Sequence, residues 1–203
     1  MAFPGFSHIY DVRDPFLKRA LRAELGPENH ELMRQIIYQD APFPASPPLL
    51  TRYMGGPLPL DIVWTGALVG PVINGRVRDL LIQEHITGWR SYQVHIKDRA
   101  RTVHTGYWHL VVDGPPCGPI DWTRGPLLER TDGWPKGKYY RGGWFDPATW
   151  SGADIFRSEN NGMILATDRV MQTFNEANVE NVEFTPLDQC EIDKFIVEMT
   201  NPQ

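Results

Sequence analysis

Six histidines and two cysteines are the side chains of this chain best suited to metal binding or nucleophilic catalysis. His95 and His104 flank a short polar stretch, and a hairpin turn centred on Arg99 and Ala100 would place their rings opposite each other on paired strands. Two facing imidazoles can share a metal ion, but no third ligand is indicated on the same face. We therefore expect ordinary strand histidines, with neither a metal nor any other cofactor.

Cys117 lies close in sequence to Asp121, and with a histidine the two would supply the groups of a catalytic triad. The stretch Pro-Pro-Cys-Gly-Pro around Cys117 has none of the local signatures of cysteine enzymes, which favours a small residue packed in a tight turn. The chain also lacks the glycine patterns that bind phosphates and the paired carboxylates of glycosidases or metal nucleases. These observations predict that the protein is not an enzyme.

Bulk composition limits the partners that this protein can have. A chain of 203 residues suits a single domain over residues 1–203, and its apolar content of 41% is ordinary for a globular protein. The formal net charge of −5 argues against nucleic acid as a partner and permits a basic protein. There is no signal-like start, no stretch long enough to cross a membrane, and too few cysteines for a disulfide scaffold. We expect a cytoplasmic protein without a membrane partner.

Residues 56–94 and 150–187 carry the same pattern of apolar positions and chain breaks, at a constant offset of 93 positions. At this offset Asp61 aligns with Asp154, and Arg76 aligns with Arg169. The alignment predicts an internal repeat, in which each copy forms a strand, a turn, an extended piece, a helix and a strand. The two aspartates are more simply explained as turn residues before their strands than as a shared two-carboxylate site.

Local signals place the elements of the first copy. Asn74 is suited to cap a helix over residues 76–84, because its side-chain oxygen can accept from the first turn. His85 and Asn178 follow the two predicted helices at equivalent places, and both residue types tolerate the left-handed backbone that ends a helix. The remaining predicted elements of the two copies are strands 61–65, 91–97, 153–157 and 181–186, and helix 169–177.

The N-terminal part of the chain is predicted to be helical over residues 14–39, after a first strand over residues 6–12. Asp14 and Pro15 form a standard helix start, and the apolar residues that follow lie at helical spacing. Residues 40–59 are too rich in proline to continue a helix. Their apolar side chains favour an ordered, extended connection over a flexible linker.

An irregular insertion over residues 114–143 separates the two copies and concentrates aromatic and charged side chains. Aromatic residues are enriched in protein–protein hot spots, and loops on a rigid scaffold often carry function. The equally weighted alternative is that these rings form a small core of their own. The predicted partner-binding residues are Trp122, Trp134, Tyr139, Tyr140, Asp121, Glu129 and Asp132.

The C-terminal quarter resembles a known family. The run W-S-G-A-D-I-F-R, followed by D-R-V, a helix and N-V-E-F-T-P-L, is similar to the C-terminal signature of bacterial immunity proteins that accompany polymorphic toxins. The group includes the double-CXXCG-motif proteins of myxobacteria, although this chain lacks both CXXCG motifs. The likeness is carried by Trp150, Asp154, Phe156, Arg157, Arg169, Val170, Val182, Phe184 and Pro186.

The resemblance implies that the protein neutralises a co-encoded toxin by direct binding. We therefore expect an α+β fold in which two related strand–turn–helix–strand units form a mixed sheet system, and a function as a cytoplasmic immunity protein. One alternative is a small enzyme or ligand-binding protein with a pocket between the two repeat halves. Another is a structural subunit recruited through the aromatic insertion. Neither the identity of the toxin nor the oligomeric state follows from the sequence.

Overall fold

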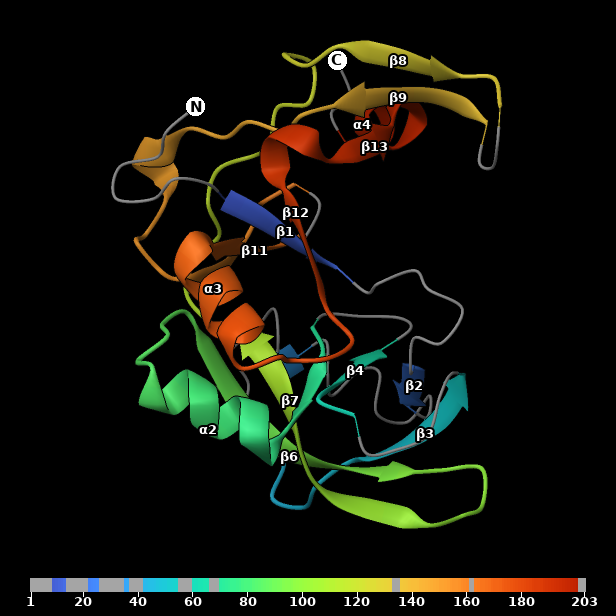
Figure 1. Cartoon of the computed structure of the whole chain (residues 1–203), viewed down its shortest axis with the longest axis vertical. Helices are drawn as coiled ribbons and strands as arrows, with labels where there is room; N and C mark the ends of the chain where they lie inside the picture. The colour runs from blue at the N-terminus through green and yellow to red at the C-terminus, as the bar shows by residue number, and fades with distance from the viewer. Residues whose placement is uncertain are drawn as a thin grey trace. The chain divides into compact units, whose positions relative to one another are not determined.

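The computed structural model describes residues 9–13, 22–25, 35–36, 42–54, 60–65, 70–132, 136–160 and 163–200 (Figure 1). The chain divides into two compact units, each assembled from separate stretches of sequence. Unit 1 comprises residues 1–13, 114–172 and 184–203, and unit 2 comprises residues 14–113 and 173–183. Helices and mixed sheets occur together, so the fold is α+β.

Unit 2 is built around a closed barrel of strands in the order β2-β3-β6-β7-β5-β4. Alternate residues of the long strands point inward, and the buried Val94, Ile96, Tyr107 and Val111 join one apolar core. The barrel strands are β2 (Arg22–Leu25), β3 (Leu49–Met54), β4 (Ile62–Thr65), β5 (Val72–Asn74), β6 (Trp89–Lys97) and β7 (Val103–Val112).

Helix α2 (Gly75–Gln83) begins and ends as its sequence predicts. The side-chain oxygen of Asn74 accepts a hydrogen bond of 3.0 Å from the backbone N–H of Val77, which satisfies one donor of the first turn. The helix buries Val77 and Leu81, and the chain leaves it through His85 at a φ of 51°. These local predictions are confirmed.

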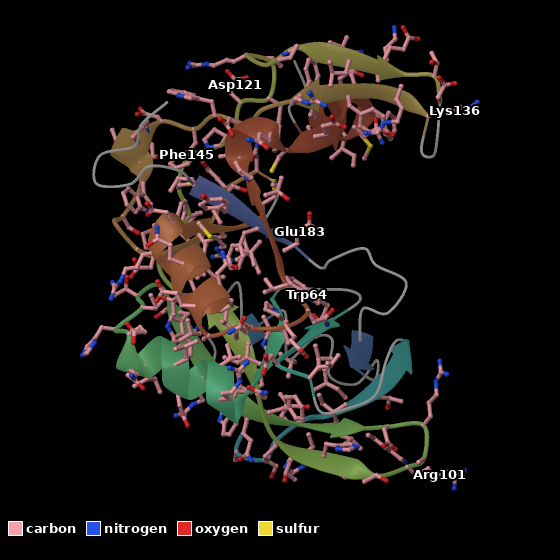
Figure 2. The ribbon with its side chains drawn as sticks, in the orientation of Figure 1. Trp64, Arg101, Asp121, Lys136, Phe145 and Glu183 are labelled. Atoms are coloured by element: carbon pink, nitrogen blue, oxygen red, sulfur yellow. The ribbon has the colours of Figure 1, made fainter. Side chains whose placement is uncertain are left out.

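The β6–β7 hairpin has a different register from the predicted one. Its turn runs over residues 98–102, with Arg101 in the left-handed region at a φ of 66°, and Arg101 lies at the tip (Figure 2). The register pairs His104 with Ile96 and not with His95. A shift of one residue turns a side chain to the other face of the strand, so the expected pairing of the two histidines is wrong. His104 Nε2 instead lies 2.9 Å from Asp98 Oδ2.

The predicted N-terminal helical segment is wrong over Arg22–Leu25. Residues Arg22–Leu25 form β2, which pairs antiparallel with β3 and parallel with β4. Their residue types favour a helix, but strand pairing supplies backbone hydrogen bonds that override that local preference. Gln35 and Ile36 are helical, and the rest of segment 14–39 lies outside the described residues. Strand β3 agrees with the ordered, extended connection predicted for residues 40–59.

Unit 1 contains two sheets. A four-stranded sheet has the order β10-β11-β1-β12, and a three-stranded sheet has the order β13-β9-β8. The strands are β1 (Ile9–Arg13), β8 (Leu127–Arg130), β9 (Gly137–Arg141), β10 (Ile155–Arg157), β11 (Ile164–Thr167), β12 (Glu183–Pro186) and β13 (Glu191–Asp193). The helical elements are α4 (Lys194–Thr200) and the 3-10 turns η1 (Pro147–Thr149) and η2 (Leu187–Gln189); helix α3 (Asp168–Glu176) contains the boundary between the units.

The prediction of an irregular insertion over residues 114–143 is wrong over β8 and β9, which form an antiparallel hairpin. The strands have four and five residues, and their apolar side chains are adjacent in sequence, as Leu127 and Leu128 or Tyr139 and Tyr140, so neither strand shows the alternation of a half-buried strand. Strand β13, which lies near the C-terminus of the chain, pairs antiparallel with β9 and completes the three-stranded sheet.

The two predicted repeat copies share several local features. Helices α2 and α3 have nine residues each and lie 93 positions apart. The pairing of Ile62 with Ile73 in unit 2 corresponds to that of Ile155 with Ala166 in unit 1. His85 and Asn178 both have a φ of 51°. The superposition of residues 61–94 on residues 154–187 as whole units stays a prediction.

Candidate functional site

A pocket of about 590 Å³ lies within unit 1. One wall comes from the loop that precedes β8, a second from β9 and a third from the C-terminal helix α4. Its volume falls within the range of roughly 300–1,000 Å³ that is typical of small-ligand sites. The lining residues are Pro119, Ile120, Asp121, Thr123, Tyr140, Val197 and Glu198.

The loop wall is held in place by hydrogen bonds to Ile120 and to Asp121. The side-chain amide of Asn160 exchanges two hydrogen bonds of 3.1 Å with the backbone of Ile120. Asp121 and Trp144 exchange two backbone hydrogen bonds of 2.6 and 3.1 Å. Because the backbones of Ile120 and Asp121 are both hydrogen-bonded, this wall of the pocket is preformed. A ligand does not have to order it.

The carboxylate of Asp121 is kept ionised by its surroundings. Oδ1 accepts hydrogen bonds from the hydroxyl and the backbone N–H of Thr123, at 2.7 and 2.9 Å, and Oδ2 accepts one of 3.0 Å from Arg124 Nε. The Thr123 hydroxyl is the largest of the influences that lower the pKa of Asp121, and Arg124 acts in the same direction. The lowered pKa favours the ionised form of Asp121, whose negative charge faces the positive charge of Arg124.

The β9 wall is braced by charges. Glu191 accepts hydrogen bonds of 2.5 Å from Arg130 and of 2.5 and 3.0 Å from Arg141, which links β13 to both strands of the β8–β9 hairpin. Arg130 also lies over the ring of Tyr139, 4.8 Å from its centroid. This network holds the strand from which Tyr140 reaches the pocket, because Tyr140 lies between Tyr139 and Arg141 in sequence.

Helix α4 presents two different surfaces. Val197 is buried in the unit 1 core, whereas Phe195, Ile196 and Met199 are exposed by 66%, 47% and 65%. Asp193 Oδ1 accepts a hydrogen bond of 2.8 Å from the backbone N–H of Phe195 and so fixes the start of the helix. Large apolar side chains that remain this exposed on one short helix mark a surface suited to a partner.

The structure separates the predicted partner-binding residues. Asp121 and Tyr140 line the same pocket. Trp122 and Tyr139 are buried, with exposures of 1% and 6%, as the small-core alternative requires. Glu129 is exposed on β8 and Asp132 follows the same strand, toward the end of the hairpin where Lys136 lies and away from Asp121 (Figure 2). Trp134 lies outside the described residues.

Sequence reasoning missed the contribution of α4, namely Val197, Glu198 and the exposed apolar residues. Residues 191–200 form β13 followed by α4. The run Phe-Ile-Val-Glu-Met resembles an ordinary core segment in composition. Only the packing of Val197 against unit 1 shows that its neighbours face outward.

The other chemical candidates are accounted for by local structure. Cys117 is 1% exposed, and burial raises the pKa of its thiol to about 12, so the thiolate needed of a nucleophile is scarce. Asp154 lies 3.3 Å from Arg169, just as Asp61 pairs with Arg76. Across the described residues, no group of three or more His, Cys, Asp or Glu side chains is placed to hold a metal ion. No described helix is long and apolar enough to cross a membrane.

No protein-family model matches this chain, and a search of curated proteins gives no match either.

Proposed function

We propose that this chain is an immunity protein that binds a bacterial toxin domain and neutralises it by direct contact in the cytoplasm. The proposal rests first on the resemblance of residues 150–187 to the C-terminal signature of such proteins. The observation that carries it is the surface of α4, where Phe195, Ile196 and Met199 stand exposed on the helix that also forms one wall of the pocket.

This surface has the properties of a protein-binding site. A partner that covers α4 would remove three large apolar side chains from water, and each buried group contributes up to about 1.5–3 kcal/mol. The pocket beside it adds a concave feature with Tyr140 and two carboxylates on its walls. The net charge of −5 favours encounter with a basic toxin surface.

Binding to the product of the neighbouring gene tests the proposal. The chain is co-expressed with the product of the gene directly upstream of its own, and complex formation is measured by affinity capture and calorimetry. We expect a stable complex and restored growth of cells that express the toxin. A neighbouring product that kills cells and neither binds this chain nor is neutralised by it would contradict the proposal.

A second candidate function is small-ligand binding in the pocket of unit 1. The volume of the pocket favours small-ligand binding. The exposed apolar face of α4 would have no role in such a function. A binding protein of this kind would take up its ligand in the absence of any protein partner. Ligand carried through purification and identified by mass spectrometry would support this candidate over the first.

A further inference from the structure

The pocket of unit 1 is lined by apolar side chains and by two carboxylates. Pro119, Ile120 and Val197 supply the apolar part, and the ring of Tyr140 forms another wall. The only charged lining residues among the described part of the chain are Asp121 and Glu198, and both are acids. Such a lining offers an apolar stem a place to pack while its charged end meets a carboxylate.

We propose that this pocket recognises an alkyl cation, that is, a guanidinium or ammonium group on an apolar stem. Resting on the proposed function, we further infer that the cation is the side chain of an arginine or lysine on the toxin. The stem packs on Ile120 and Val197, and the cationic group meets Glu198 and the face of Tyr140. Attraction between a cation and the face of an aromatic ring strengthens this arrangement.

Glu198 is the carboxylate that makes direct contact. Its side chain is 57% exposed at the pocket wall. Within the protein it forms an ion pair with Lys194, one helical turn earlier on α4. Exposed pairs of this kind are weak because water solvates both groups, so an incoming cation can share the carboxylate. Lys194 is therefore an internal competitor of the ligand.

Asp121 has a different part in recognition. Both of its oxygens already accept hydrogen bonds, from Thr123 and from Arg124. Arg124 is itself held against the ring of Trp144, 3.4 Å from its centroid. Asp121 therefore positions the loop wall of the pocket and leaves direct pairing with the cation to Glu198.

Small cations test the pocket without any toxin. The full chain, labelled with ¹⁵N, is titrated with n-butylguanidinium and n-butylammonium, and with the neutral isostere n-butylurea as a control. The readout is the shift of backbone amides in residues 120–123, 140 and 197–198. We expect both cations to bind at least fivefold more tightly than n-butylurea, with an affinity that falls as salt is added.

Three variants should change the binding of the cations in different directions. Glu198→Gln removes the direct acceptor and should reduce the preference for the cation to less than twofold. Lys194→Gln removes the competitor and should strengthen cation binding at least twofold. Asp79→Asn removes an exposed carboxylate that is paired with Arg78 on unit 2, and it should leave the preference unchanged.

Several outcomes would overturn the pocket proposal. They are equal binding of n-butylurea, unchanged preference in Glu198→Gln, and amide shifts that lie outside the pocket. Tyr140→Leu, which keeps the apolar wall but removes the aromatic face, should weaken binding of both cations. If it does not, the ring makes no contact with the cation.

Binding to the toxin separates this inference from the proposed function. A toxin that binds this chain and loses at least tenfold in affinity to Glu198→Gln identifies a protein side chain as the natural occupant. A toxin that binds equally to both forms leaves the immunity function standing and contradicts the arginine or lysine inference. If the small cations bind but no toxin complex forms, the natural occupant is a free cationic ligand, and the arginine or lysine inference is overturned together with the proposed function.

Discussion

The buried Asp61 and the half-exposed Arg76 form an ion pair that links three parts of unit 2. The Asp61 carboxylate accepts hydrogen bonds from the Arg76 guanidinium, from Asn74 Nδ2 at 2.9 Å and from the backbone N–H of Glu180 at 2.9 Å. Arg76 in turn donates a hydrogen bond of 2.8 Å to the carbonyl oxygen of Ala177. The chain that follows α3 is thereby fastened to β4 and to the start of α2.

Removing this carboxylate should destabilise the protein. We expect Asp61→Ala to lower the free energy of unfolding by about 2–3 kcal/mol, because Asn74, Arg76 and the Glu180 amide lose a charged acceptor. Urea unfolding followed by circular dichroism measures the change. Asp79→Asn, an exposed acid paired with Arg78, is the control and should change stability by less than about 0.5 kcal/mol.

The Asp61 contribution should also depend on pH. Burial by itself raises the pKa of Asp61, but the hydrogen bonds from Arg76, Glu180 and Asn74 outweigh burial and lower it below the unfolded-state value. The stabilisation is then complete above roughly pH 4 and is lost as the pH falls through the folded-state pKa. Stability curves of wild type and Asp61→Asn should therefore converge in acid, and curves that stay parallel down to pH 2 would contradict this account.

Glycine should be tolerated directly after the ends of α2 and α3. His85 and Asn178 adopt a φ of 51°, where a side chain is strained and glycine is not. We expect His85→Gly and Asn178→Gly each to leave the melting temperature unchanged or to raise stability by up to about 1 kcal/mol. Valine at either position should destabilise. A loss of stability with glycine at only one of the two positions would argue against equivalent turns.

Trp122 and Tyr140 should respond differently to truncation. Trp122 is 1% exposed in the unit 1 core, so Trp122→Ala should lower stability by about 3–5 kcal/mol. Tyr140 lines the pocket, and we expect Tyr140→Ala to weaken toxin binding about tenfold or more, equal to ~1.4 kcal/mol, with a much smaller fall in melting temperature. Affinity and melting are measured on the same samples. If the two losses match for Tyr140, its ring belongs to the core and not to the interface.

The exposed face of α4 should matter for binding and not for folding. Phe195→Ser and Met199→Ser change side chains that are 66% and 65% exposed, so stability should change by less than about 0.5 kcal/mol. Each should weaken toxin binding at least fivefold in calorimetry. Ile82→Ser, at a 51% exposed position on α2 in unit 2, is the matched control and should bind as wild type. Equal effects of all three changes would place the interface elsewhere.

Short-range signals were sufficient for several elements. Asn74, the apolar spacing of α2 and the left-handed residue His85 act within one or two helical turns of each other. Their effects do not depend on the rest of the chain, so the sequence predicted both ends of that helix. Helix α3 lies 93 positions after α2, as the alignment of the two copies predicts.

Strand pairing was decided by the tertiary structure. Residues Arg22–Leu25 have helix-favouring side chains, yet they pair with β3 and β4 in the barrel. Strand β13 pairs with β9 although some fifty residues separate them, and the turn at Arg101 moves the β6–β7 register by one residue. Each outcome depends on hydrogen-bond partners or on turn geometry that residue types alone do not specify.

The candidate site also combines features that the sequence predicts with features that only the tertiary structure decides. The aromatic and acidic character of residues 114–143 directed attention to Asp121 and Tyr140 from the sequence alone. Whether a ring in that segment faces solvent or core depends on what packs against it, and only the fold buries Trp122 while it leaves Tyr140 at a pocket. The sequence determined which chemical groups were present. The tertiary structure brought α4 beside them, because the burial of Val197 fixes which face of that helix remains exposed.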